Sequence, residues 1–323
     1  MSLFRPRGIL ALTAAIALLG AGTASAPTVL LQPFASAPYP HPSRANGFTY
    51  GTTHYDAPTH YNDSTVGIVV PAGYRPGPTV DFVVHFHGWS NHVTQVLERY
   101  RLAEQLQNSG RNAILVVPQG PKDAQDSGDG KLELDDGALA RLLDDVVVFL
   151  RQRGVTRATT IGHIAITAHS GGYKVASAVL VHGGVSDRVT DVVLFDATYG
   201  DLEGFADWAN GGPNRRLVSF FTDALGTADV ALMALVQRNG APLTVRLDPN
   251  WSPDDLRPRH AAFVLCRSIP HDELLQQRSF FATAIATSAL DTRQGPKSVL
   301  TPSAPPVLHE AALAPCTQVP CGS

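Results

Sequence analysis

The sequence predicts one doubly wound α/β domain, a mostly parallel sheet covered by helices on both faces. Short apolar runs alternate with segments of helical length along most of the chain, the order expected of strand and helix in this class. The runs lack polar alternation, as strands buried on both faces do. A chain with 44% hydrophobic and 16% charged residues provides one full core.

The predicted strands are short runs rich in Val, Ile, Leu and Phe. They cover residues 66–70, 80–86, 113–117, 164–168, 192–195, 217–221 and 261–265, with an additional run at 243–247. The helical segments between them begin near Thr94, Gly137, Gly171 and Ala228. They end before Gly110, Gly154, Gly183 and Gly240, where we expect left-handed caps.

The two ends of the chain differ from this domain. Residues 1–26 resemble a secretory signal, because Arg5 and Arg7 precede an apolar run that ends in a small-residue cleavage pattern. An uncleaved anchor is the alternative, although the run is short for a membrane span. We therefore expect a secreted or periplasmic protein with no membrane span after cleavage.

The predicted domain covers residues 62–290. Residues 27–61 lack apolar periodicity and are predicted to form an extended arm on its surface. Residues 291–323 form a Pro-rich tail, in which Cys316 and Cys321 lie close enough to form a small disulfide loop in an oxidising compartment. Cys266 is predicted to be a buried free thiol.

The strongest motif surrounds Ser170. An apolar strand leads into Ala168-His169-Ser170-Gly171-Gly172, and a helix follows at once. Small residues permit the sharp turn that raises a serine hydroxyl above a sheet, and the helix start offers backbone N–H groups to an oxyanion. The alternative is a tight turn with a capping serine. We predict that Ser170 is a nucleophile.

A second motif, His85 to Trp89, ends an earlier strand. Its His-Gly turn at Gly88 is suited to aim a backbone N–H at the reaction centre, so Trp89 and Gly171 are the predicted oxyanion donors. His85 and His87, with His92 nearby, also permit a zinc site, although no further ligands complete it in the sequence.

The predicted general base is His271, which follows the last apolar strand and is the only histidine late enough in the chain. Two aspartates compete to orient it. We favour Asp196, fixed directly at a strand end, over Asp223, whose loop equally suits a helix cap. Asp272 adjoins His271 and its side chain should diverge.

Together these motifs resemble the α/β-hydrolase superfamily over nearly all of residues 62–290. Residues 137–150 further resemble its branch of secreted esterases, feruloyl esterases and polyhydroxybutyrate depolymerase-like proteins. Ser170, Trp89, Gly171 and His271 match the family's nucleophile, oxyanion and base positions. Ala168, in place of the usual glycine, and the run at 243–247 depart from its simplest pattern.

The resemblance implies a serine esterase that works through an acyl-enzyme without a cofactor or metal. Its substrate would be a small-molecule or polymeric ester. A net charge of −3 without a basic block argues against a nucleic-acid partner. The alternatives are an amidase or peptidase on the same residues, a metallohydrolase using His85 and His87, and a non-catalytic binding module on the same fold.

Little or no lid is expected over the cleft. Residues 197–213, between two successive strands, have room only for a short helix, so we predict an open cleft. Trp89, Tyr199, Trp208 and Trp251 come from loops that reach its mouth or else cover the edge of the core.

Overall fold

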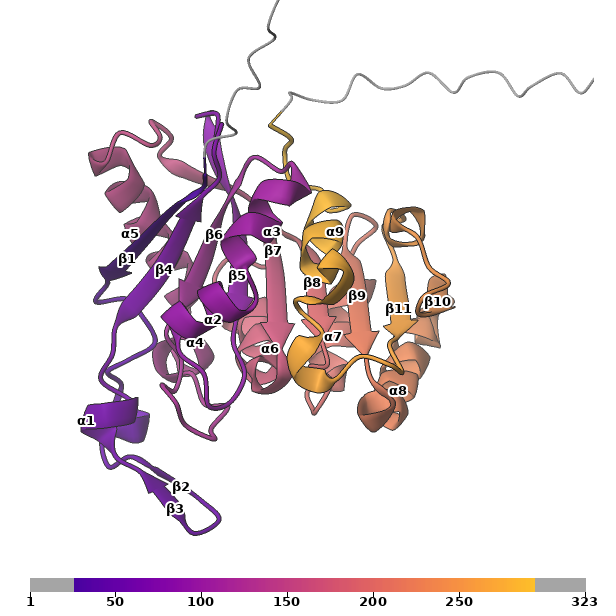
Figure 1. The fold of residues 1–323 in the computed structure, drawn as a ribbon, viewed down its shortest axis with the longest axis horizontal. Coiled ribbons are helices and arrows are strands. Elements are labelled where there is room, and N and C mark those ends of the chain that lie inside the picture. The colour runs from indigo at the N-terminus through magenta and orange to yellow at the C-terminus, as the bar shows by residue number, and fades with distance from the viewer. Residues whose placement is uncertain (1–25, 294–323) are drawn as a thin grey trace, which may run out of the picture.

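A nine-stranded sheet forms the centre of the molecule in the computed structural model, which describes residues 26–293 (Figure 1). The strand order is β1-β4-β6-β5-β7-β8-β9-β11-β10, and the strands from β6 to β10 are parallel. Only β4 runs opposite to its neighbours β1 and β6. The predicted doubly wound, mostly parallel sheet is therefore confirmed.

Every predicted strand is present, including the additional run. The strands of this sheet are β1 (Thr28–Pro33), β4 (Thr65–Val70), β5 (Thr79–Phe86), β6 (Ala113–Pro118), β7 (Thr160–His169), β8 (Val189–Phe195), β9 (Arg216–Phe221), β10 (Leu243–Leu247) and β11 (Ala261–Leu265). The run at 243–247 adds an edge strand beside β11, beyond the last strand that the family pattern expects.

Helices cover both faces of the sheet, and two apolar clusters mark the two sides. On one face pack α5 (Ala138–Gln152), α6 (Tyr173–His182), α7 (Leu202–Asn210) and α8 (Gly226–Val236). On the other pack α2 (Val93–Arg99), α3 (Leu102–Ser109) and α9 (Phe280–Ala286). Alternate residues of the strands between the two edges contribute to the two clusters, as the period of a strand requires. Within residues 26–293 no helix has the length and apolar character needed to cross a membrane.

The helix before Gly183 ends where predicted, but the predicted left-handed caps are present at only three of the four glycines. Gly110, Gly154 and Gly240 have φ of 71°, 71° and 70°, in the left-handed region that a cap requires. Gly183 was predicted to do the same, and this is wrong, because its φ is −65°. The N–H of Gly183 still donates to the carbonyl of Val179, as in a helix. The left-handed residue is the next one, Gly184.

The predicted surface arm is more structured than expected. Residues 28–33 form β1, an edge strand that pairs with β4. Val29 and Leu31 remain 46% and 49% exposed, so one face of this edge strand is left uncovered, unlike the central strands. The rest of the arm carries α1 (Ala57–His60) and a hairpin of β2 (Phe48–Tyr50) and β3 (Thr53–Tyr55), which projects from the body in Figure 1.

The predicted domain ends at residue 290, close to the last described residue, Arg293. The chain is fixed up to Arg293, since Asp291 N–H donates to Asp81 and Arg293 N–H donates to the carbonyl of Gly110. The predicted signal peptide up to residue 25, and Cys316 and Cys321, lie outside the described residues. Cys266 is a buried free thiol, as predicted.

Candidate active site

Ser170 lies at a sharp strand-to-helix turn. It follows β7 directly and begins a short 3₁₀ turn, Ser170–Gly172, that leads into α6. Its φ is 52°, in a region that non-glycine residues rarely adopt. Ala168 is fully buried at the end of β7, before the turn begins, so its methyl group is accommodated there.

Small residues are required around this turn by close approach. A Cβ atom at Gly88 would lie 2.7 Å from the Cβ of Ser170, and one at Gly172 would lie 2.4 Å from the carbonyl oxygen of Phe86. The end of β5 and the Ser170 turn therefore touch backbone to backbone, which explains the glycines in both motifs.

His271 and Asp196 form a hydrogen-bonded pair at the same edge of the sheet. His271 Nδ1 lies 2.8 Å from Asp196 Oδ2. Because a carboxylate only accepts, Nδ1 carries the proton and Nε2 is left as the basic nitrogen. Asp196 also accepts from Thr222, at 2.7 Å from the backbone N–H and 2.9 Å from the hydroxyl.

The charge on Asp196 is held by these donors. Burial alone would raise the pKa of this carboxyl, but the hydrogen bonds from His271 and Thr222 outweigh it and keep the pKa below its ordinary value. Asp196 therefore stays ionised at neutral pH, although its side chain is only 1% exposed.

The other two acidic candidates lie elsewhere. Asp223 begins a 3₁₀ turn before α8, is 64% exposed and pairs with Arg267 at 3.3 Å. Asp272 is 62% exposed and pairs with Arg99 at 3.4 Å, so its side chain diverges from His271 as expected.

A buried histidine, His169, supports the His271 loop from the other side. Its Nε2 donates to the backbone carbonyl of His271 at 3.1 Å, and the two rings lie 4.7 Å apart at 31°. Burial, together with the neighbouring His271, lowers the pKa of His169 to about 4. This ring is therefore neutral at neutral pH.

The predicted oxyanion donors lie beside Ser170. The indole of Trp89 covers Gly171, since a Cβ at Gly171 would lie 2.6 Å from the Trp89 ring. Trp89 Nε1 donates to Ser127 Oγ at 2.7 Å, which fixes the ring. Gly171 is the second residue of the Ser170–Gly172 turn, where the first N–H groups of a helix have no partner inside it.

His85 and His87 have protein partners of their own. His85 is fully buried and contacts the Thr167 hydroxyl at 2.9 Å, and His87 Nε2 accepts from the backbone N–H of Gly120 at 3.2 Å. His92 pairs with Asp123. Among residues 26–293 no group of three or more His, Cys, Asp or Glu side chains is arranged to hold a metal ion. The metallohydrolase alternative therefore has no ligand set in this part of the chain.

A cavity of about 170 Å³ opens at Ser170. It is lined by Trp89, Ser127, Ser170, Gly171, Tyr173 and Tyr199. The Tyr199 ring meets the His271 ring edge-on, with centroids 6.3 Å apart. No hydrogen bond joins Ser170 to His271 in the described residues, as is common where the bond tightens only around a substrate.

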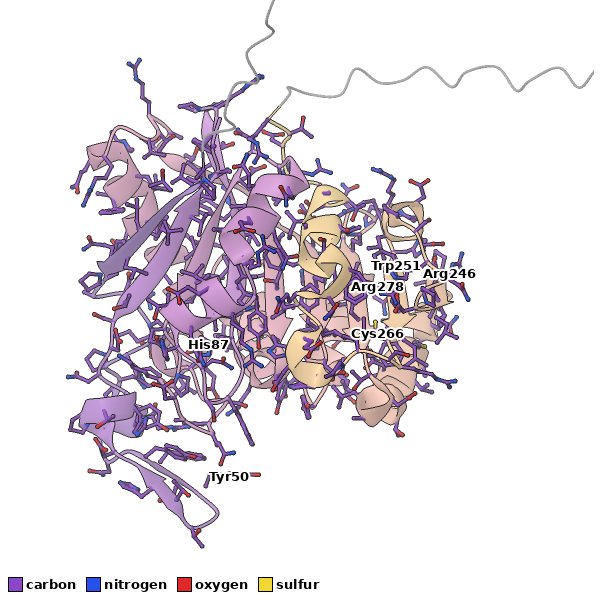
Figure 2. The ribbon with its side chains drawn as sticks, in the orientation of Figure 1. Tyr50, His87, Arg246, Trp251, Cys266 and Arg278 are labelled. Atoms are coloured by element: carbon purple, nitrogen blue, oxygen red, sulfur yellow. The ribbon has the colours of Figure 1, made fainter. Side chains whose placement is uncertain are left out.

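Only two of the four predicted mouth aromatics line this cavity. Trp89 and Tyr199 do. Trp208 belongs to α7 and is 4% exposed, packed into the core. Trp251 packs on Phe220 and Phe280, near β10 and β11 and far from the hairpin that carries Tyr50 (Figure 2). For these two tryptophans the alternative of covering the core holds, since Trp208 belongs to the apolar cluster on the α7 face and Trp251 packs against the cluster on the other face.

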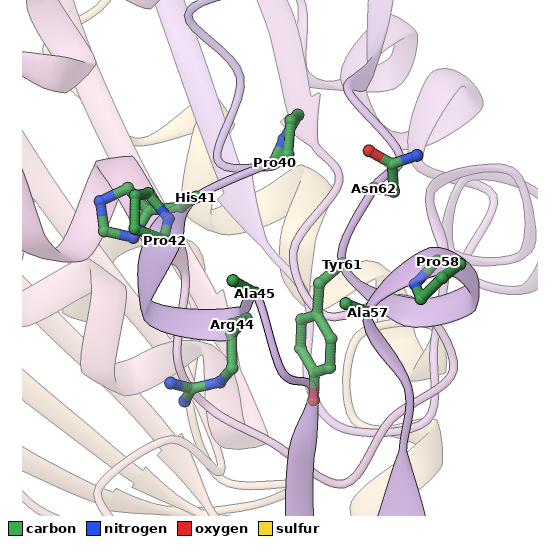
Figure 3. A pocket seen from close by; sticks show the side chains of 9 residues that line it. All are labelled: Pro40, His41, Pro42, Arg44, Ala45, Ala57, Pro58, Tyr61 and Asn62. Carbon is green, nitrogen blue, oxygen red and sulfur yellow. The ribbon is translucent and has the colours of Figure 1, made fainter.

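A larger hollow of about 600 Å³ lies in the N-terminal arm, between residues 40–45 and 57–62 (Figure 3). None of its lining residues belongs to the Ser170 cavity, and none of them is a serine, threonine or cysteine. We therefore take the smaller cavity as the candidate active site.

Sequence reasoning missed three contributors to this site. Thr222, His169 and Ser127 hold Asp196, His271 and Trp89 respectively. His169 stands inside the elbow motif, where its neighbour Ser170 was the only residue singled out. Thr222 and Ser127 are ordinary loop residues, and no local signal marks them.

Comparison with known proteins finds similar solved structures, but no protein-family model and no curated protein sequence matches this chain. One of these structures is a serine-to-alanine mutant of the feruloyl esterase module from Clostridium thermocellum complexed with sinapinate, 13% identical over 81% of this chain and 88% of that one, with a TM-score of 0.51. Another is a ferulic acid esterase from Anaeromyces mucronatus, 14% identical over 83% and 92%, with a TM-score of 0.49.

The sheet order, the helices on both faces and the first of these structural neighbours all indicate the same fold. The chain has the α/β-hydrolase fold, and feruloyl esterases are among its structural neighbours, as the sequence resemblance predicted. The α7 segment between β8 and β9 packs Phe205 and Trp208 into the core rather than over the Ser170 cavity. This agrees with the expected short connection.

Proposed function

We propose that this protein is a serine hydrolase of carboxylic esters. The observation that carries the proposal is the His271–Asp196 hydrogen bond of 2.8 Å at the edge of the sheet where the strained Ser170 turn opens into a cavity. A base oriented by a buried carboxylate, at the sheet edge where a partly exposed serine lines a cavity, is the arrangement that acyl transfer to serine requires.

In the proposed mechanism Ser170 Oγ attacks the ester carbonyl while His271 Nε2 accepts the hydroxyl proton. The resulting oxyanion is bound by the backbone N–H groups of Trp89 and Gly171, at the turn formed by Gly88. Each such donor is worth roughly 3 kcal/mol in the transition state. His271 then gives the proton to the departing alcohol, and the acyl group remains on Ser170.

Water completes the cycle by the reverse use of the same groups. His271 Nε2 takes a proton from water, the hydroxide attacks the acyl carbon, and Ser170 leaves as the proton returns to its oxygen. Asp196 stabilises the imidazolium in both halves and keeps Nδ1 protonated. The reaction needs no cofactor.

Labelling by a fluorophosphonate probe tests this proposal. We expect the probe to attach to Ser170, a short-chain nitrophenyl ester to be hydrolysed, and Ser170→Ala to abolish both while the circular dichroism spectrum is retained. An unlabelled, folded protein would indicate a non-catalytic binding module. Activity that survives Ser170→Ala and disappears with a chelator would indicate the His85 and His87 alternative.

Matched ester and anilide substrates separate the esterase from an amidase or peptidase. An anilide with the same acyl group has a poorer leaving group, so an esterase should prefer the ester by several orders of magnitude. Comparable kcat/KM values for the two substrates would favour the amidase alternative.

We also propose that the protein is exported. The support is the signal-like pattern of residues 1–26, which precedes β1 directly. N-terminal sequencing of protein from the periplasm or culture medium should begin after Ala26, and a full-length protein retained in the cell would contradict export.

A further inference from the structure

The β2–β3 hairpin places one more aromatic side chain against a residue that lines the Ser170 cavity. The Tyr50 ring packs edge-on against Trp89, with centroids 4.9 Å apart at 64°. Trp89 lines the cavity and Tyr50 does not, so Tyr50 extends the aromatic wall outward. Tyr50 remains 46% exposed and lies on the projecting hairpin (Figures 1 and 2).

The hairpin is firmly anchored at its base. Arg44, just before it, makes two hydrogen bonds to Asp126, at 2.6 and 3.0 Å, and its guanidinium lies 4.8 Å from the centre of the Phe48 ring. After the hairpin turn, the Tyr55 hydroxyl donates to Gln125 at 3.2 Å. Because the hairpin is anchored in this way and the Tyr50 ring packs on Trp89, a ligand that stacks on this ring has little protein freedom to remove.

The anchors share a segment with the site itself. Gln125 and Asp126 lie next to Ser127, the residue that accepts the Trp89 indole N–H. The segment Gln125 to Ser127, the β2–β3 hairpin and Trp89 are therefore connected by these contacts into one wall beside the cavity.

The chemistry of this wall restricts what it can bind. The cavity is lined by glycine, serine and aromatic side chains, with no charged side chain among its lining residues. Its volume of about 170 Å³ is below the roughly 300 Å³ at which sites for larger ligands begin, so a large ester must extend outside it. Outside the cavity, the half-exposed ring of Tyr50 packs against Trp89.

We propose that Tyr50 is a specificity-determining residue, and that with Trp89 it forms a stacking subsite for a flat neutral ring carried by the part of the ester outside the cavity. An aryl ring and the apolar face of a sugar present the same chemistry to such a wall. This inference rests on the proposed esterase function.

Kinetics with butyrate esters that differ only in the alcohol test the subsite. The substrates are ethyl butyrate, 2-naphthyl butyrate and a glucoside butyrylated at its primary hydroxyl. Tyr50→Ala should raise KM for the naphthyl ester about 5- to 10-fold relative to the change for the ethyl ester. A rise for the glucoside would include sugars among the ligands. A second series of ethyl esters, butyrate against naphthoate, places the ring on the acyl side.

Two variants serve as controls. Tyr50→Phe keeps the ring and should retain most of the preference. Thr53→Ala alters the cross-strand partner of Tyr50 on the same hairpin and should leave every KM unchanged. Equal effects of Tyr50→Ala on ring-bearing and ethyl esters in both series, or no effect on any ring-bearing ester, would overturn the proposal.

A binding measurement keeps this test separate from the proposed function. Calorimetry with 2-naphthyl butyrate and 1-naphthoic acid ethyl ester on the Ser170→Ala protein should show a Kd that Tyr50→Ala weakens by the same factor. Failure to hydrolyse any ester would overturn the esterase proposal alone, whereas an unchanged Kd for both ligands would overturn the subsite alone.

Discussion

The loops that follow β8 and β9 begin alike and end in different environments. Each supplies an aspartate at the carboxyl edge of the sheet, yet Asp196 is 1% exposed and Asp223 is 64% exposed. The difference arises because the β9 loop turns back toward β8, so that Thr222 donates twice to Asp196 while Asp223 faces Arg267. The loop after β9 thus supplies hydrogen-bond donors to Asp196, the aspartate of the loop after β8.

The largest expected effect separates these two aspartates. Asp196→Asn should lower kcat by about 10⁴, because an amide at this position favours the wrong tautomer of His271. Asp223→Asn should leave kcat near that of the unmodified protein. Steady-state kinetics of both variants on one nitrophenyl ester make the comparison, and the reverse pattern would assign the carboxylate role to the β9 loop.

A buried acid that joins the two loops offers a test of stability. Asp229 accepts from Ser219 of β9 at 2.6 Å and from Thr198 after β8 at 2.5 Å. Burial outweighs these bonds and raises the pKa of Asp229 from 3.8 to about 6. The folded state therefore binds this proton more tightly than the unfolded state, so the contribution to stability is full below pH 3.8 and is lost as the pH rises through about 6.

Asp229→Asn removes this titration. Between pH 4 and pH 7 the free energy of unfolding of the unmodified protein should fall by about 2 kcal/mol relative to that of the variant. Urea unfolding at several pH values measures both, and the difference cancels the other titrating groups. A difference that stays constant with pH would contradict the raised pKa.

A smaller effect is expected from the donor that the β9 loop lends to Asp196. Thr222→Val keeps the shape and the backbone donor but removes the hydroxyl bond of 2.9 Å. A hydrogen bond to a charged group contributes about 1.5–3 kcal/mol, so kcat should fall at least tenfold if His271 is held less well. Thr222→Ser retains the hydroxyl and should restore most of kcat, which a merely structural defect would not show.

The smallest effect concerns the support on the other side of His271. His169→Phe keeps a ring against His271 and removes the hydrogen bond to its carbonyl, so kcat should fall about fivefold.

The same variant also removes a buried base whose pKa is lowered to about 4, and whose contribution to stability is lost as the pH falls below 6.5. His169→Phe should therefore lose less stability than the unmodified protein between pH 6.5 and 4. An unchanged kcat and the same acid sensitivity would show that His169 has neither role.

Much of the fold could be read from local patterns. Central strands are buried on both faces, so their apolar runs are continuous and were located to within a few residues. β1 was missed because its apolar run is only Val29 to Leu31, in a segment otherwise rich in Pro, Ala and Ser, and two of these side chains stay exposed. The β2–β3 hairpin was missed because its exposed residues give no burial signal.

The features of the candidate site likewise fall into those that local sequence predicts and those that it does not. The sequence by itself determined the Ser170 turn, since the small residues, the strand and the helix start that produce it are neighbours in the chain. It also limited the choice of aspartate to Asp196 and Asp223, because strand ends are local features.

Only the tertiary structure decided which aspartate meets His271, which tryptophans line the cavity, and that Tyr50 packs on Trp89. These outcomes depend on contacts between segments distant in the chain, where burial and hydrogen-bond partners are set by how loops fold back on one another. Residue type and local spacing carry no record of that arrangement.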